Sequence, residues 1–203
     1  MYRGVLSNAN LYVLLLRIDR EIAEKVRLAG CPWCGGRLDT ADFPPRKPRG
    51  AGAPLPKGYD KRLSFCCDKD GCRSRATPPS VRFLGRKLYL GAVVVVVVAA
   101  MRHGVTAERA AKLSAWLGVS QRTIERWRRW WRELFPATPF WQAARGRLRS
   151  PVASAELPLS LLVQFVADDP LAQVVSLLRF ISPLTAGSAG SAALAEGRNL
   201  MGN

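Results

Sequence analysis

The chain has 203 residues, 48% of them hydrophobic, and its 31 Arg and Lys against 15 Asp and Glu give a formal net charge of +16. This size and apolar content suffice for one or two compact domains with a buried core. The charge is uneven, because residues 61–149 carry 19 basic and 5 acidic side chains whereas residues 150–203 carry 2 and 4. We therefore expect the middle of the chain to bind a polyanion. We do not expect the C-terminal quarter to contribute to this binding.

The apolar segments are too short for export or for crossing a membrane. Leu11–Leu16 is shorter than a signal-peptide core and acidic residues follow it, so we expect a cytoplasmic, nucleoid-associated protein. Leu88–Met101, which contains six consecutive valines, has 14 residues, whereas a bilayer-spanning helix needs roughly 20. In a reducing cytoplasm the five cysteines favour metal thiolates over disulfides.

Residues 1–30 contain the first helical pattern. Over residues 8–29 apolar side chains recur at spacings of three and four, and Gly30 follows as a stop signal. These side chains are Leu11, Leu15, Ile18, Ile22 and Val26. The spacing predicts an amphipathic N-terminal helix, which packs against its own domain or against a second copy of the chain.

Two close cysteine pairs follow this helix. Cys31-Pro-Trp-Cys34 and Cys67-x4-Cys72 each form a small turn that aims two thiolates at one point, as tetrahedral Zn²⁺ requires. Because neighbouring residues of a strand point to opposite faces, only one of Cys66 and Cys67 is expected to ligate the metal. We favour Cys67, since a four-residue gap closes a normal knuckle, and Cys66 is the alternative.

The predicted ligands, Cys31, Cys34, Cys67 and Cys72, indicate one structural zinc ion in a small zinc ribbon over residues 31–80. Gly71 is expected to permit the tight turn before the last ligand. Four thiolates close the site, and the one histidine, His103, lies in a basic segment, so no position is left for a catalytic water. The alternatives are unrelated buried thiols or a redox role for the first pair.

Residues 43–58 separate the two cysteine pairs. This stretch holds five prolines and three glycines, a composition that predicts a partly disordered loop. Its basic side chains are Arg46, Lys47, Arg49 and Lys57.

Residues 81–150 show the spacing of a helix-turn-helix. Thr106 can cap one helix, Gly118 supplies the turn, and Ser120 can cap a second helix. The side chains expected to face inward are Ala107, Ala110, Leu113 and Leu117 on the first helix and Ile124, Trp127, Trp131 and Leu134 on the second. A further short basic helix is expected over Phe140–Arg149.

The outer face of the second predicted helix is basic. Gln and Arg at the start of such a helix can make bidentate contacts to adenine or guanine edges, while later arginines meet phosphates. The predicted DNA-binding residues are Gln121, Arg122, Thr123, Arg126, Arg128, Arg129 and Arg132. An ordinary helical hairpin with a solvated basic face is the alternative. The charge and the adjoining ribbon favour double-stranded DNA as the partner.

The C-terminal quarter is apolar. Two short helices are predicted near Pro158–Ala167 and Pro170–Ile181, within residues 151–183, and we expect them to pack onto the N-terminal helix or to form a homodimer interface. Residues 184–203 are rich in Gly, Ala and Ser and are expected to form a disordered tail. The predicted fold class is mainly α: an N-terminal helix, a zinc ribbon of short β-hairpins, a helix-turn-helix domain and short C-terminal helices.

Several of these motifs together resemble a known family. Cys31-Pro-Trp-Cys34-Gly, Cys67-x4-Cys72-Arg-x-Arg-x-Thr, Leu88–Met101 and Gly118-Val119-Ser120 are similar to the N-terminal zinc-ribbon and helix-turn-helix part of insertion-sequence transposases, over about residues 31–135. The second cysteine pair is also similar to that of the Ogr/Delta phage activators. The resemblance implies that Leu88–Met101 is a helix, although β-branched propensity alone favours a strand.

The resemblance does not extend to catalysis. A transposase uses a carboxylate triad on a large catalytic domain, and the 54 residues after Arg149 are too few for one. We expect a non-enzymatic, zinc-stabilised DNA-binding protein, with neither membrane nor small-molecule substrate, that serves a mobile element or regulates transcription. The alternatives are an RNA- or ribosome-associated zinc-ribbon protein, or a non-catalytic scaffold that docks on a transposase.

Overall fold

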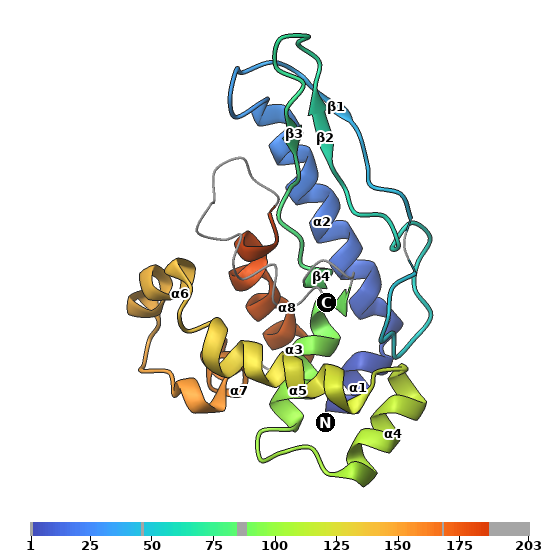
Figure 1. Ribbon diagram of the computed structural model, residues 1–203, viewed down its shortest axis with the longest axis vertical. Coiled ribbons are helices and arrows are strands. Elements are labelled where there is room, and N and C mark those ends of the chain that lie inside the picture. Colours follow the sequence, from blue (N-terminus) through green and yellow to red (C-terminus); the bar gives the residue numbers. More distant parts are fainter. Residues whose placement is uncertain (1, 46, 85–88, 168, 187–203) are drawn as a thin grey trace.

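The computed structural model describes residues 2–45, 47–84, 89–167 and 169–186, and α-helices dominate it (Figure 1). The helices are α1 (Tyr2–Ser7), α2 (Ala9–Ala29), α3 (Gly91–Ala100), α4 (Ala107–Leu117), α5 (Gln121–Arg129), α6 (Pro139–Ala144), α7 (Leu159–Leu162) and α8 (Pro170–Ile181). The strands are β1 (Leu38–Thr40), β2 (Phe65–Cys67), β3 (Arg75–Ala76), β4 (Phe83–Leu84) and β5 (Tyr89–Leu90). The mainly α fold class is confirmed. Within the described ranges, no helix combines the length and apolar character that a bilayer crossing requires.

α2 forms where the apolar spacing predicts the N-terminal helix. The side chain of Asn8 caps its first turn by accepting a hydrogen bond from the N–H of Asn10 at 2.9 Å, and the helix ends at Gly30. Leu11, Leu15 and Ile18 are buried in the main core, so the helix packs against its own chain. The short helix α1, which precedes α2, was not predicted.

α3, which contains the six valines, lies at the centre of the helices. Every residue from Gly91 to Ala99 is buried, and α1, α5, α7 and α8 pack around it (Figure 1). The predicted helix is confirmed, because packing on all sides outweighs the strand preference of valine. It begins at Gly91 rather than at Leu88, since Tyr89 and Leu90 form β5, which pairs antiparallel with β4.

α4 and α5 occupy the predicted positions, and the predicted caps are in place. The side chain of Thr106 accepts a hydrogen bond from the N–H of Arg109 at 3.3 Å, and Ser120 caps α5 through the N–H of Thr123. Gly118 between the helices is left-handed, with φ 64°.

The inward-facing positions were predicted with one error. On the first helix Ala110 and Leu117 are buried and Leu113 is half-buried, but Ala107, the first residue of α4, is exposed. On the second helix Ile124, Trp127 and Trp131 are buried and Leu134 is half-buried. A π-helical turn, Trp130–Leu134, continues α5, and α6 accounts for part of the short basic helix expected over Phe140–Arg149.

The C-terminal helices complete the same core. α8 packs against α3 and α1, so its apolar face is covered within the chain, while α7 is shorter than predicted. Order also extends past the predicted start of the tail: Ser182–Thr185 form a 3-10 turn. The hydroxyl of Thr185 accepts a hydrogen bond from the N–H of Ser80 at 2.7 Å, which anchors the turn. Residues 187–203 of the predicted tail lie outside the described residues.

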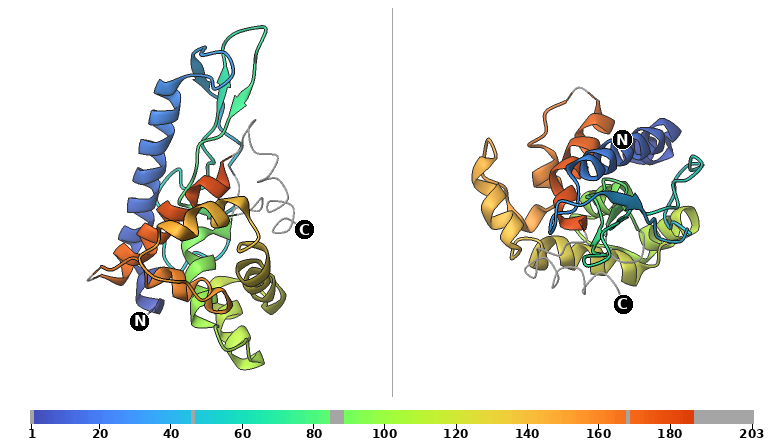
Figure 2. Two further views of the ribbon diagram at one scale, coloured as in Figure 1. Left: turned by 90° about the vertical axis from the view of Figure 1, so that its left-hand side faces the viewer. Right: turned by 90° about the horizontal axis from the view of Figure 1, so that it is seen from above.

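The three-stranded antiparallel sheet β1-β2-β3 lies at the C-terminal end of α2, far from the other helices (Figure 2). A small separate core of Ala23, Cys31, Leu38, Phe65, Cys67 and Ala76 holds it together. The loop expected to be partly disordered runs back to the first half of α2 and is anchored there, since the N–H of Gly52 donates to the hydroxyl of Tyr12 at 3.2 Å. Arg46 of this loop lies outside the described residues.

Candidate functional site

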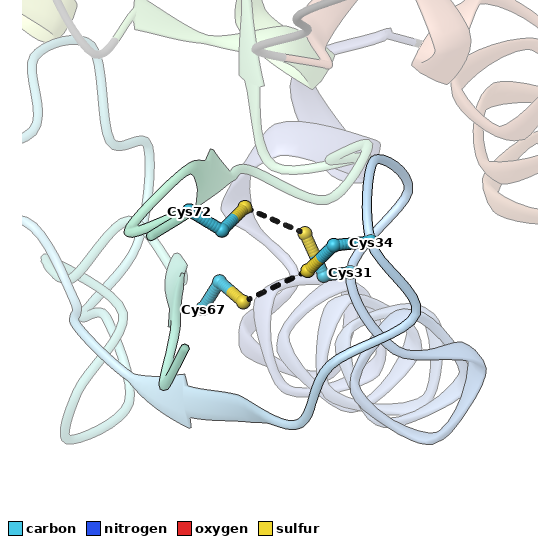
Figure 3. Close-up of side chains that lie close together, drawn as sticks. All are labelled: Cys31, Cys34, Cys67 and Cys72. Carbon is cyan, nitrogen blue, oxygen red and sulfur yellow. Dashed lines mark hydrogen bonds between the residues drawn. The ribbon is translucent and has the colours of Figure 1, made fainter. Parts of the chain in front are cut away.

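Four of the five cysteines meet at the end of α2. The Sγ atoms of Cys31, Cys34, Cys67 and Cys72 all lie within 4.8 Å of one another (Figure 3). The shortest separations are 3.4 Å between Cys34 and Cys67 and 3.7 Å between Cys31 and Cys72. The first pair follows the last turn of α2, whereas Cys67 ends β2 and Cys72 lies in the turn before β3.

Backbone hydrogen bonds shape the two turns that carry these thiols. The N–H of Cys31 donates to the carbonyl of Gly36 at 2.8 Å, and the N–H of Cys72 donates to that of Lys69 at 2.9 Å. Gly36 permits close approach of the turns, because a Cβ there would lie 3.0 Å from the sulfur of Cys67. The tight turn predicted before Cys72 is present and includes Gly71, but Gly71 does not adopt the left-handed conformation there; Arg73, directly after Cys72, does so, with φ 46°.

Cys66 stays outside the cluster. Its sulfur lies 3.4 Å from the backbone oxygen of Arg73, whereas the neighbouring Cys67 is fully buried among the other three thiols. The alternation of side chains along β2 produces this difference. The structure therefore brings together the four cysteines that the sequence predicts.

The pKa values of Cys67 and Cys72 are shifted in opposite directions. Hydrogen bonds from the side chain and backbone of Ser74 lower the pKa of Cys72 to about 6. The backbone N–H of Lys69 lowers the pKa of Cys67, but burial and hydrogen bonds to the other three cysteines outweigh it and raise that pKa to about 12.

The donor set fits a metal ion. With metal–sulfur bonds of about 2.3 Å, a tetrahedral Zn²⁺ site places its sulfurs about 3.8 Å apart, close to the two shortest separations here. Four sulfur donors fill a tetrahedral coordination sphere and leave no place for a substrate or a water. Such a site can hold the turns together.

The predicted DNA-binding residues fall into two groups. Gln121, Arg122 and Arg129 are exposed on α5, and Thr123 is half-buried at its cap. Gln121 donates a hydrogen bond to Glu125 at 2.9 Å, and Arg129 lies 3.8 Å from Glu133. These contacts are on the surface, so the side chains can exchange them for contacts with a partner.

The other three arginines, Arg126, Arg128 and Arg132, are half-buried. Arg126 donates a hydrogen bond to the hydroxyl of Tyr89 at 3.0 Å, and Arg132 donates to the backbone oxygen of Arg102 at 2.5 Å. Burial lowers the pKa of Arg128, and the charge of Arg132 lowers it further. Partial burial therefore distinguishes these three arginines from the exposed group, and Arg126 and Arg132 also form hydrogen bonds to other segments of the chain.

Neighbouring segments add to this basic surface, as the uneven charge and the basic segment over Phe140–Arg149 predict. Residues 102–149 contain eleven Arg and Lys against three Glu, a net charge of +8 without His103. Arg102 and the arginines after α6 (Arg145, Arg147 and Arg149) are exposed.

The four-cysteine cluster and the basic face of α5 lie far apart. α2 has 21 residues, which at 1.5 Å per residue give about 32 Å, and α5 packs on α3 near the other end of the molecule (Figure 1). The sequence expectation of a ribbon that directly adjoins and delivers the second helix therefore needs correction. No known protein family, curated protein or solved structure matches the chain.

Proposed function

We propose that the protein binds double-stranded DNA through α5, without catalysis, and that a structural zinc ion holds its β-sheet end together. The single observation that carries the proposal is the division of α5 into two faces. Ile124 and Trp127 are buried against the core, whereas Gln121, Arg122 and Arg129 are exposed within a segment of strong positive charge.

The proposed contacts follow from the chemistry of the exposed side chains. Gln121 and Arg122, in the first turn, have the geometry for bidentate bonds to adenine and guanine in the major groove. Arg129, two turns later, suits a phosphate. Arg126, one of the predicted DNA-binding residues, donates a hydrogen bond to Tyr89, and we propose that it supports α5 rather than contacting a base.

The proposed zinc acts on structure alone. Cys31, Cys34, Cys67 and Cys72 would hold the ion, and the closed sulfur set supplies no reactive position. The resemblance to transposase N-terminal regions favours a role in transposition or transcription in the cytoplasm.

Anisotropy measurements with a labelled mixed-sequence duplex test the proposal. Arg122→Ala and Arg129→Ala should each weaken binding, and Arg129→Ala should lower the salt slope by about one. Arg17→Ala is the matched control, because Arg17 is an exposed arginine of α2 whose side chain is 72% exposed. It should bind as the wild type does.

Competition with structured RNA and binding-site selection complete the test. If structured RNA displaces the duplex at equal concentration, the protein is an RNA binder and the DNA proposal is wrong. If selection enriches a motif with the wild type and loses it with Arg122→Ala, α5 reads bases. If both α5 variants and the control bind DNA equally well, α5 is not part of the DNA interface.

A further inference from the structure

A cavity of about 620 Å³ opens between α1, the C-terminal end of α3 and α4. Its walls are mostly apolar and include Leu6, Val96, Val97, Met101, Leu113 and Trp116. Cavities of about 300–1,000 Å³ are typical of small-molecule sites. Neither the four-cysteine cluster nor the outer face of α5 shares these residues.

The cavity exists because α4 is held mainly by α5. Of the residues in α4, only Ala110 and Leu117 are buried, and small Ala115 and Ala100 of α3 line the space between the helices. Leu113 and Trp116 are half-buried and border the space. An apolar occupant would remove this surface from water, at about 25 cal/mol per Å².

The polar groups that line the cavity are cationic. Arg3 and Lys112 belong to its lining, and no Asp or Glu does so among the described residues. The guanidinium of Arg3 lies 5.2 Å from the ring centroid of Trp116. Lys112 pairs with Glu108 at 2.7 Å, but their side chains are 75% and 76% exposed, so an anion can compete for the lysine.

We propose that this cavity binds a small amphipathic carboxylate, with its apolar body between α3 and α4 and its carboxylate at Arg3 and Lys112. Such a ligand satisfies both features of the site, the apolar walls and the two cationic side chains in the lining. It would also tie α4 to the core across the space that separates them.

Calorimetric titration with decanoate, below its micelle concentration and without nucleic acid, tests this site independently of DNA binding. We expect one saturable site per chain and weaker binding of decanol, which lacks the charge. Arg3→Gln or Lys112→Gln should weaken decanoate binding by up to about fivefold, the effect of losing one exposed ion pair.

Two tryptophan substitutions on α4 distinguish the cavity from the basic surface. Leu113→Trp fills the cavity and should abolish binding, whereas Ala111→Trp, at an exposed position of the same helix, should leave it unchanged. Ala100→Leu fills the cavity from α3 and replaces Leu113→Trp if that variant does not fold. Undiminished binding by a folded cavity-filling variant, or equal affinity for decanol and decanoate, would overturn the proposal.

Discussion

Arg82 and Asp19 form an ion pair inside the protein. Arg82 Nε lies 2.7 Å from Asp19 Oδ2, and the two side chains are 0% and 1% exposed. The N–H of Val81 donates to the other carboxylate oxygen at 2.7 Å, and Arg82 also donates to the carbonyls of Tyr59 and Lys61 at 2.7 and 2.8 Å. The pair thereby joins α2 to the segment that precedes β2 and to the segment that follows β3.

Breaking this pair should destabilise the protein strongly. Asp19→Asn leaves the charge of Arg82 buried without a counter-ion, and we expect a loss of about 3–5 kcal/mol in the free energy of unfolding, measured with urea. The matched control is Glu21→Gln, which removes the partner of Arg17 on the same helix, where both side chains are exposed. It should cost less than about 1 kcal/mol. If both variants lose a similar amount of free energy of unfolding, burial does not make the Arg82–Asp19 pair more important than the exposed pair.

The ligand assignment predicts an unequal effect of neighbouring cysteines. Cys67→Ser should remove about one metal ion per chain, because it deletes one of four sulfur ligands. Cys66→Ser should retain the metal, since that sulfur lies outside the cluster. Metal content after gel filtration measures both, and the opposite order would overturn the assignment.

Proton release on metal binding should depend on pH in a defined direction. Above pH 6 Cys72 has already lost its proton, because its pKa is lowered to about 6, whereas Cys67, with a pKa raised to about 12, still carries one. Zn²⁺ should therefore displace fewer than four protons at pH 7.5, and the number should rise as the pH falls below 6. Metal affinity should fall over the same range. Calorimetry in buffers of different ionisation enthalpy counts the protons.

Arg126 should act on stability rather than on base recognition. Arg126→Met removes the hydrogen bond to Tyr89 and should lower the free energy of unfolding by about 1–2 kcal/mol. Tyr89→Phe, which deletes the other partner, should have a similar effect, and the double variant should add little to either. Arg122→Met is the exposed control on the same helix and should leave stability unchanged. Additive losses in the double variant would show that the two residues act separately.

The last described turn should contribute to stability. Thr185→Val leaves the N–H of Ser80 without its 2.7 Å partner and should cost about 1–3 kcal/mol. A chain that ends after Ala186 should unfold at a higher urea concentration than one that ends after Ile181. Equal midpoints for the two truncations would mean that the turn contributes nothing.

Local signals predicted α2, α4, α5 and α8, whereas α1 was not predicted and α3 was predicted only through the resemblance. Asp169 and Pro170 mark the start of α8, and its bounds agree with the sequence prediction because capping and a first-turn proline act within a few residues. The cysteine cluster was equally predictable, since each turn is local and the ligand types are specific.

Contacts between distant parts of the chain were not predictable. Arg126 meets Tyr89 across 37 positions and Thr185 meets Ser80 across 105, and neither contact has a sequence pattern. The orientation of α2 in the fold could not be predicted either. Periodicity specifies which face of a helix is buried, but it does not specify where the two ends of the helix lie. The separation of the four-cysteine cluster from α5 follows from that orientation.

The location of the cysteines defines where the protein is chemically vulnerable. All five lie between residues 31 and 72, and the main core of the helices contains none of them. Oxidation of the thiolates to disulfides would expel a bound metal and disrupt the sheet, which depends on a few buried residues around the cluster. The helices would keep their packing, so oxidative damage would be confined to one end of the molecule.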